Sequence, residues 1–301
     1  MKNGTEIVFF YLYDTGRSID LKRVATMVPA IPDVDIIKNK RDTPQSLMLP
    51  APLILGLGRH EGEAGDSFES ITLNARIFEE GVISLWARVR GKYSPKELYR
   101  IRTMTFTIDG KETNIESWVD ESLKSLFASI QEAITFEQYV FSTFVRETYT
   151  AFCLTSPLRD PERFVEANRR TIACLLNGES PETNLHASQI ESTMRSTFSY
   201  TDRDYIVLDL DRCLIIDPDK NYEDILVVVE QAVFQLVELR SLDMLLDRWL
   251  DKAEDDAKIT FKKNTARLKL IKIRLASIQA LSFDALFILE NLENSSKIIG
   301  D

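Results

Sequence analysis

The chain has 301 residues, of which 44% are hydrophobic and 28% are charged, and its formal net charge is −10. This length and composition suit a protein of one large or two ordinary domains that buries a core, and they exclude a disordered chain. The negative charge argues against a general nucleic-acid binder, because phosphate groups would be repelled. No stretch reaches the roughly 20 apolar residues of a membrane span.

The first 110 residues predict several strands. Glu6–Tyr13 is apolar, aromatic and β-branched, which is typical of a buried strand, and Val34–Lys38 suits an edge strand between prolines. Ser70–Phe78 and Val82–Arg90 each alternate apolar with other residues on either side of the turn Glu79–Gly81. This period of two predicts a hairpin with one buried and one exposed face.

The next part of the chain mixes helices with strands. Ser94-Pro95-Lys96-Glu97 is a capping box that opens a short helix. Further helices are expected at 116–133, 161–176 and 187–197, and strands at 136–152, 205–209 and 213–217. Residues 1–217 therefore predict an α+β head domain, built on a mainly antiparallel sheet with helices on one face, as one unit or as subdomains 1–110 and 111–217.

One stretch, Ile206–Asp217, resembles the first motif of haloacid-dehalogenase-type phosphatases. In that family a strand delivers a nucleophilic aspartate, and a second aspartate two residues on acts as general acid beside magnesium; Asp209 and Asp211 match these places. Such a site also needs later strands that carry a Ser or Thr, a Lys and further acids, but after Asp217 only helices are expected. We therefore predict no catalytic residue, metal or cofactor, and keep a metal-dependent phosphohydrolase using Asp209 and Asp211 as the alternative.

The stretch from Asn221 to about Ser296 predicts two long helices, because apolar residues recur at steps of three and four. The end of the first half is acidic and the start of the second half is basic. One straight rod would join these blocks only at the junction, whereas a hairpin turning near Ala257–Asn264 places them side by side. We predict an antiparallel coiled-coil stalk at 218–301, with a seam that includes Ala232, Leu236, Leu239, Leu246, Leu268, Ile271, Leu275 and Ile278.

The basic block at the start of the second arm has two interpretations. It pairs with the acidic first arm, or it binds an outside anion such as a lipid headgroup or RNA. The first interpretation is favoured, because the predicted hairpin places the acidic first arm alongside the block. The block comprises Lys262, Lys263, Arg267, Lys269, Lys272 and Arg274.

The order of several short motifs resembles an uncharacterised bacterial family related to the Required for Meiotic nuclear Division proteins. The motifs are Leu175–Glu179, Ser199-Tyr200 with Asp204, the strand pair 205–217, and Glu238-Leu239-Arg240 in a long helix. The resemblance implies an α+β head, a helical hairpin, a hydrophobic C-terminal anchor in the longer protein, and a membrane-associated organising role without an established reaction.

Together these observations predict a non-enzymatic assembly or scaffold protein. Its head would bind a protein partner, and its stalk would set spacing or self-associate. We expect a cytoplasmic protein without a cofactor, held at the inner face of a membrane by a segment beyond Asp301 or by an anionic membrane surface; nucleic acid is not an expected partner.

Overall fold

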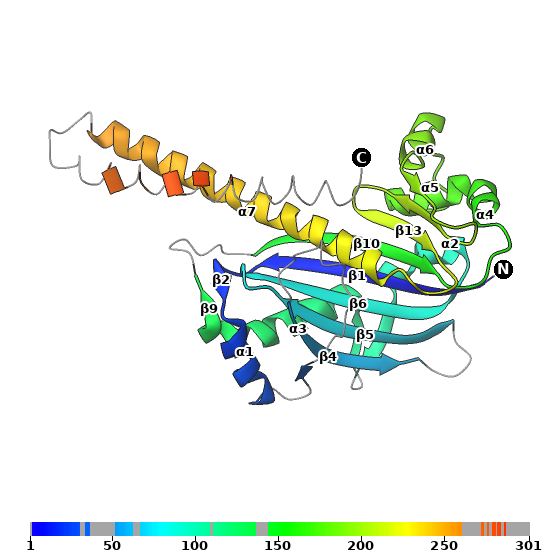
Figure 1. The fold of residues 1–301 in the computed structure, drawn as a ribbon, viewed down its shortest axis with the longest axis horizontal. Coiled ribbons are helices and arrows are strands. Elements are labelled where there is room, and N and C mark those ends of the chain that lie inside the picture. The colour runs from blue at the N-terminus through cyan, green and yellow to red at the C-terminus, as the bar shows by residue number, and fades with distance from the viewer. Residues whose placement is uncertain are drawn as a thin grey trace.

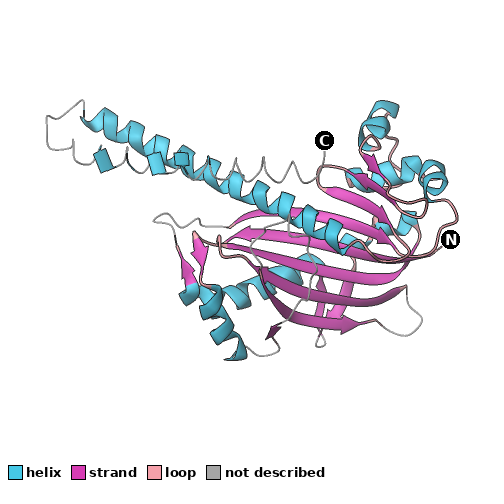
Figure 2. Cartoon of the chain, viewed as in Figure 1, coloured by secondary structure: helices cyan, strands magenta, loops and turns pink. Residues whose placement is uncertain are grey.

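The computed structural model describes residues 2–30, 34–36, 52–62, 67–108, 111–136 and 144–260, together with scattered helical residues between 272 and 286. It is an α+β structure built around one nine-stranded sheet, with helices on both faces (Figure 1, Figure 2). In spatial order the strands are β11 (Thr197–Phe198), β12 (Tyr205–Leu208), β13 (Arg212–Ile216), β10 (Val145–Leu154), β1 (Asn3–Asp14), β6 (Val82–Tyr93), β5 (Phe68–Ile77), β4 (Leu53–Glu61) and β3 (Asp35–Ile36).

Shorter elements complete the described fold. β2 pairs with β9, and β7 pairs with β8, as two separate two-stranded ladders. These strands are β2 (Ser18–Ile19), β7 (Thr105–Ile108), β8 (Lys111–Asn114) and β9 (Ile134–Thr135). The helices are α1 (Leu21–Met27), α2 (Pro95–Leu98), α3 (Ile115–Ile130), α4 (Pro161–Ala167), α5 (Arg169–Asn177), α6 (Ala187–Thr193) and α7 (Glu223–Thr260).

The main sheet is mixed. All of its neighbouring strands are antiparallel except β10 and β13, which run parallel with Thr150 opposite Arg212. The predicted hairpin of β5 and β6 is confirmed, with Ile77 opposite Ile83. The predicted strands at β1, β12 and β13 and the capping box at Ser94 and Glu97 are confirmed as well.

The central strand β1 shows why helices are needed on both faces. Its side chains alternate between two hydrophobic clusters: Ile7, Phe9 and Tyr11 belong to one, and Val8 and Phe10 belong to the other. All five are buried. A strand that buries both of its faces requires a covering layer on each side of the sheet.

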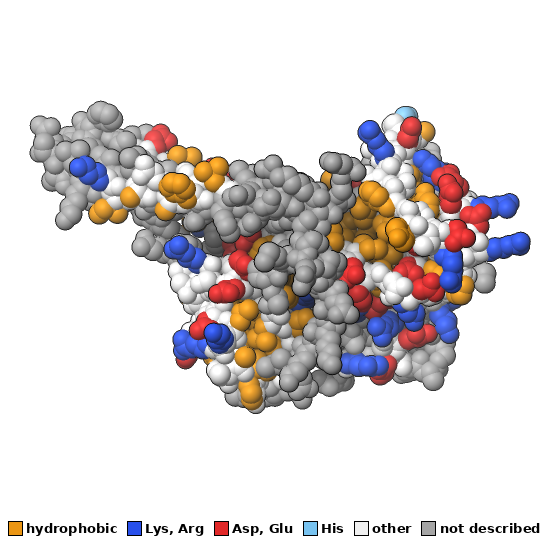
Figure 3. Space-filling model, in the orientation of Figure 1, with side chains coloured by type: hydrophobic (Ala, Val, Ile, Leu, Met, Phe, Trp, Pro, Cys, Tyr) orange, Lys and Arg blue, Asp and Glu red, His pale blue; other side chains and the backbone are white. Residues whose placement is uncertain are grey.

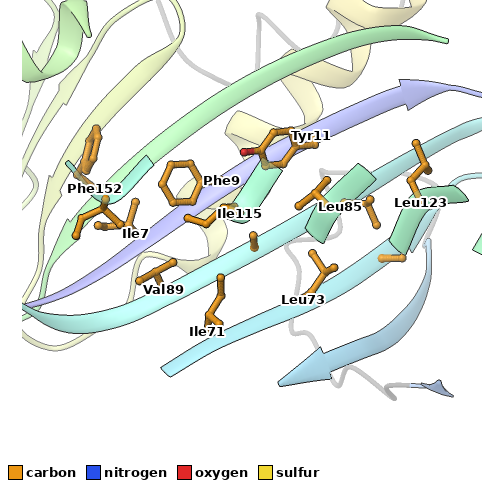
Figure 4. Close-up of a cluster of buried hydrophobic side chains, with 14 of the residues drawn as sticks. Ile7, Phe9, Tyr11, Ile71, Leu73, Leu85, Val89, Ile115, Leu123 and Phe152 are labelled. Atoms are coloured by element: carbon orange, nitrogen blue, oxygen red, sulfur yellow. The ribbon is translucent and has the colours of Figure 1, made fainter. Parts of the chain in front are cut away.

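The larger cluster lies between the sheet and helices α1 to α6. Figure 4 shows Phe9 of β1, Leu85 of β6 and Leu73 of β5 pointing toward Ile115 and Leu123 of α3. Helix α3 begins at an Asn114 cap whose side chain accepts a hydrogen bond from the Ser117 amide, and its buried residues follow helical spacing.

The opposite face is covered by the first half of α7, which crosses β1 and β10 (Figure 1). Leu226, Val233 and Val237 of this helix are buried with Phe10 and Trp86 of the sheet. The prediction of helices on one face is therefore wrong. The sheet buries both sides, and α7 supplies the second layer that was expected to stand apart as a stalk.

The predicted coiled-coil hairpin is also wrong. In the described chain the first half of α7 packs on the sheet and not on a second helix. The buried stripe follows Leu226, Glu230, Val233 and Val237, one residue later than the predicted seam. Of that seam, Ala232 is exposed and Leu236 is 39% exposed, while Leu239 and Leu246 are half-buried.

The sequence pattern misled because a charged residue, Glu230, lies within the true buried stripe. It interrupts the apolar series on the buried face. The predicted seam, one residue earlier along the helix, has no such interruption and therefore has the more continuous apolar pattern. The second half of the predicted seam, Leu268, Ile271, Leu275 and Ile278, lies outside the described residues. The divisions at residues 110 and 217 stay predictions.

Candidate functional site

Helix α7 is attached to the sheet by a buried charged contact at Glu230, which is 2% exposed. One carboxylate oxygen accepts a 2.6 Å hydrogen bond from the Trp86 indole nitrogen, and the other lies 3.1 Å from Nε of Arg76. Arg76 is itself 5% exposed. Because a buried charge needs a partner, these three side chains fix the position and rotation of α7 on the sheet.

A second charged contact holds the beginning of α7. Arg88 of β6 donates two hydrogen bonds to Glu223, of 2.5 and 2.7 Å. Directly before the helix, the Tyr222 hydroxyl donates a 2.5 Å hydrogen bond to Glu6 of β1. Arg90 of β6 donates to the other oxygen of Glu6 at 3.1 Å. The forked geometry of an arginine–carboxylate pair adds orientation as well as attraction.

The two contacts form one group, which we call the anchor cluster. Three arginines, at positions 76, 88 and 90, are balanced by three glutamates, at positions 6, 223 and 230. The guanidinium groups of Arg76 and Arg88 lie over the Trp86 ring, 4.6 and 4.9 Å from its centroid. Burial opposes the charge of Arg88, but the hydrogen bonds to Glu223 and the field of Glu6 outweigh it and raise the pKa of Arg88.

Beyond the anchor cluster α7 stays in contact with the sheet as far as Arg240. Phe234 packs on Phe78, with ring centroids 4.9 Å apart, and Val237 is fully buried. Arg240 forms an ion pair with Glu147 of β10. Past this point the helix extends beyond the edge of the sheet (Figure 1). We call residues 241–260 the projecting arm.

The described surface of the projecting arm combines apolar and acidic side chains. Met244 is 41% exposed and Leu250 is 57% exposed. Hydrophobic side chains are visible along this part of α7 in Figure 3. The exposed acids of the same segment are Asp243, Asp247, Asp251 and Glu254. Their spacing of three and four residues places them on the same side of the helix as Met244 and Leu250.

The two aspartates of the alternative catalytic prediction lie at a hairpin tip between β12 and β13. The Asp209 amide donates to the Arg212 carbonyl at 2.9 Å, and the Asp209 side chain accepts from the Leu210 amide at 2.8 Å. Asp211 is exposed. Within the described residues there is no group of three or more His, Cys, Asp or Glu side chains that could hold a metal ion. Asp209 thus has a local role in shaping the turn.

A hollow of about 620 Å³ lies between the start of α4 and the loop that precedes β12, at the opposite end of β12 from this hairpin tip. Asp204 organises that loop, since its carboxylate accepts hydrogen bonds from the amides of Tyr200 and Thr201 and from the Thr201 hydroxyl. Burial disfavours the charge of Asp204, but these hydrogen bonds outweigh it and lower its pKa. The Asp204 carboxylate therefore stabilises the loop.

The basic block is mostly outside the described residues. Lys262, Lys263, Arg267, Lys269 and Arg274 are not described, and Lys272 is helical and exposed. Neither interpretation of this block is tested, and both stay predictions.

A family model described as "Uncharacterized protein MJ0711, N-terminal domain" matches residues 4–223, which is more than half of the chain. The chain belongs to this family. The matched region ends at Glu223, the first residue of α7. It therefore contains the sheet side of the anchor cluster but not Glu230 or the projecting arm.

A member of this family from Methanocaldococcus jannaschii is the uncharacterized protein MJ0711. It is 28% identical over 100 residues, which make up 33% of this chain and 30% of that relative. The aligned region thus spans less than a third of the relative's length. No solved structure matches the chain. Among the helices of the described part, none is long and apolar enough to cross a membrane.

Sequence reasoning missed the whole anchor cluster. Arg76 and Arg88 lie in strands whose apolar alternation was recognised, but their positions were assigned to the exposed face of the hairpin. A signal was present, because Trp86 shares that face with both arginines and is too large and apolar to be left uncovered. It indicated a second covering layer.

Proposed function

We propose that this protein is a non-enzymatic assembly protein. The head would hold α7 at a fixed angle, and the projecting arm would bind a protein partner. The observation that supports this most is the contrast along one helix. The first half is locked to the sheet by the anchor cluster, and the second half extends beyond the sheet with Met244 and Leu250 exposed, while Leu245 between them is buried.

A fixed arm favours binding for an energetic reason. Association loses the freedom of every segment that must become ordered, so a helix that is already held in place loses less. The buried contacts of Glu230 and the bidentate pair of Arg88 with Glu223 restrict the helix before any partner arrives. The arm can therefore set a defined distance between the sheet and a bound partner.

The surface of the arm indicates the chemistry of that partner. Met244 and Leu250 offer apolar contact area, while Asp243, Asp247 and Asp251 give that side of the helix a negative charge. Two such arms would repel each other, which disfavours self-association through this surface. We infer a partner helix with apolar residues at intervals of three and four, flanked by Lys or Arg.

The binding prediction is tested with a fluorescent synthetic helix that carries leucines flanked by lysines. We expect the intact chain to bind this peptide, and the double variant Met244→Gln/Leu250→Gln to bind it roughly tenfold more weakly, because two apolar contacts are lost. Fluorescence anisotropy at two salt concentrations measures both effects. Higher salt should weaken the binding, since the attraction between exposed charges is screened.

Two controls make the result specific. Leu210→Gln alters a leucine that is 96% exposed at a distant hairpin, and it should leave binding unchanged. A peptide with glutamates in place of lysines should not bind. Equal binding by the intact chain and the double variant would refute the role of the arm.

The alternative hydrolase and the membrane role stay predictions. A metal-dependent phosphohydrolase would require turnover of a generic phosphate ester that disappears in Asp209→Asn, and that result would contradict the assembly proposal. The membrane association implied by the resemblance to the Required for Meiotic nuclear Division proteins has no contact among the described residues to support it.

A further inference from the structure

The described residues between 272 and 286 form an exposed helical face, drawn as the orange and red pieces that follow α7 in Figure 1. All of these described residues are helical and exposed. Three of them carry large apolar side chains: Ile273 is 57% exposed, Phe283 is 72% exposed and Leu286 is 61% exposed. A row of large apolar side chains in solvent is typical of a surface that another molecule covers.

Four residues of this face lie in one line along the helix, which we call the mirrored stripe. They are Ile273, Ala276, Ala280 and Phe283. Their steps of three, four and three residues keep them on one side of a helix. The steps are the same in both directions from the middle of the stripe, with a large side chain at each end and alanines in the centre. None of these residues belongs to the predicted coiled-coil seam.

The mirrored spacing indicates which partner fits the stripe. In a two-fold symmetric dimer both copies use the same surface, so that residue i contacts residue j and residue j contacts residue i. When two copies of the helix lie antiparallel about the centre of the stripe, Ile273 of each copy meets Phe283 of the other. Ala276 likewise meets Ala280, and these small side chains let the helices approach closely.

The charges of this face also allow two copies to meet. Among the described residues between 272 and 286 only Lys272 is charged, in contrast to the acidic side of the projecting arm. An antiparallel pair sets the two Lys272 residues about 18 Å apart along the helix axis, at 1.5 Å per residue. That separation exceeds the roughly 8 Å over which exposed charges act at physiological salt. Antiparallel packing also sets the two helix dipoles in opposite directions, which is favourable.

We propose that the mirrored stripe is the interface of a homodimer, in which this helix pairs antiparallel with the same helix of a second copy. A helix pair of this length buries less than the roughly 1,200–2,000 Å² of a stable complex. The dimer therefore forms reversibly, with a dissociation constant on the order of 10 µM. It uses neither Met244 nor Leu250 of the projecting arm, so it goes beyond the proposed function and does not depend on it.

Sedimentation velocity of the intact chain tests the dimer. We expect the mass to rise from that of one chain toward that of two as the concentration increases from about 1 to about 100 µM. Phe283→Glu should raise the dissociation constant at least about a hundredfold, because each dimer loses two apolar rings and gains two charges. Leu210→Glu changes a leucine that is 96% exposed at a distant hairpin, and it should leave the dissociation constant unchanged.

Cysteine crosslinking tests the orientation of the two helices. Chains with Ile273→Cys should form a disulfide with chains that carry Phe283→Cys, because these positions meet in the antiparallel pair. Ile273→Cys alone should not crosslink to itself, since its two copies lie about 15 Å apart along the helix axis and a disulfide spans less than about 7 Å between Cα atoms. The native Cys153, Cys174 and Cys213 are buried and do not compete.

Three results would overturn the dimer. They are an intact chain that stays monomeric at every concentration, a Phe283→Glu variant that dimerises as the parent does, and an Ile273→Cys variant that crosslinks to itself as fast as to Phe283→Cys. The peptide assay fails separately. A monomeric chain that binds the synthetic helix contradicts only the dimer, and a dimeric chain that does not bind it contradicts only the proposed function.

Discussion

Replacing Glu230 by alanine is expected to lower the free energy of unfolding by about 3–5 kcal/mol, the usual cost of removing one partner from a buried ion pair. The change leaves Arg76 buried without its carboxylate and removes the acceptor of the Trp86 indole N–H. Denaturant unfolding followed by circular dichroism measures the loss. A shift in tryptophan emission should accompany it, because the surroundings of Trp86 change.

An exposed ion pair gives the matched control for this substitution. Arg203 and Asp219 are 3.1 Å apart, but their side chains are 58% and 53% exposed. Asp219→Ala should therefore cost no more than about 1 kcal/mol. If both alanine variants lost the same small amount of unfolding free energy, Glu230 would not attach α7 to the sheet.

The second large effect is expected at Phe234, which distinguishes the face of α7 that the structure buries from the predicted coiled-coil seam. Phe234→Ala removes a side chain that is 5% exposed and packed on Phe78, so it should lower the free energy of unfolding by about 3–5 kcal/mol. Leu236→Ala removes a seam residue that is 39% exposed. It should cost less than about 1 kcal/mol.

The same denaturant titration measures both variants. The informative result is which variant loses more unfolding free energy, because both changes shorten an apolar side chain on the same turn of one helix. A larger loss for Leu236→Ala than for Phe234→Ala would indicate that α7 is rotated relative to the structure described above. It would also indicate that the predicted seam residues form the buried face of α7.

Local patterns in the sequence predicted much of the sheet. Strand β1, the hairpin of β5 and β6 and the capping box at Ser94 depend on residues that are close in sequence, so their signals are visible without any knowledge of the fold. The strand expected at 136–152 was placed correctly from Val145 onward, where β10 begins.

The position of α7 could not be predicted in the same way. Its attachments join residues far apart in sequence: Glu230 meets Trp86 across 144 positions, and Tyr222 meets Glu6 across 216. Apolar steps of three and four occur both in a coiled coil and in a helix on a sheet. Glu230 then broke the true stripe, and the charged residues of β5 and β6 were assigned to solvent.

The candidate site was predicted least well, for a related reason. Asp209 and Asp211 follow a hydrophobic strand, as a catalytic aspartate does in the phosphatase family, but Asp209 shapes a tight hairpin and β12 pairs antiparallel with β13. A dozen residues carry the motif, whereas catalysis depends on groups that other strands must bring nearby. Only the three-dimensional arrangement shows what surrounds an aspartate.

Hydrogen exchange along α7 shows whether the first half of this helix is part of the second hydrophobic core of the sheet. We predict that the amides of Leu226–Val237 exchange as slowly as those of β1, because both open only when the core unfolds. The amides of the projecting arm should exchange faster. If the amides of Leu226–Val237 exchanged as fast as those of the arm while β1 stayed protected, α7 would not be anchored to the sheet.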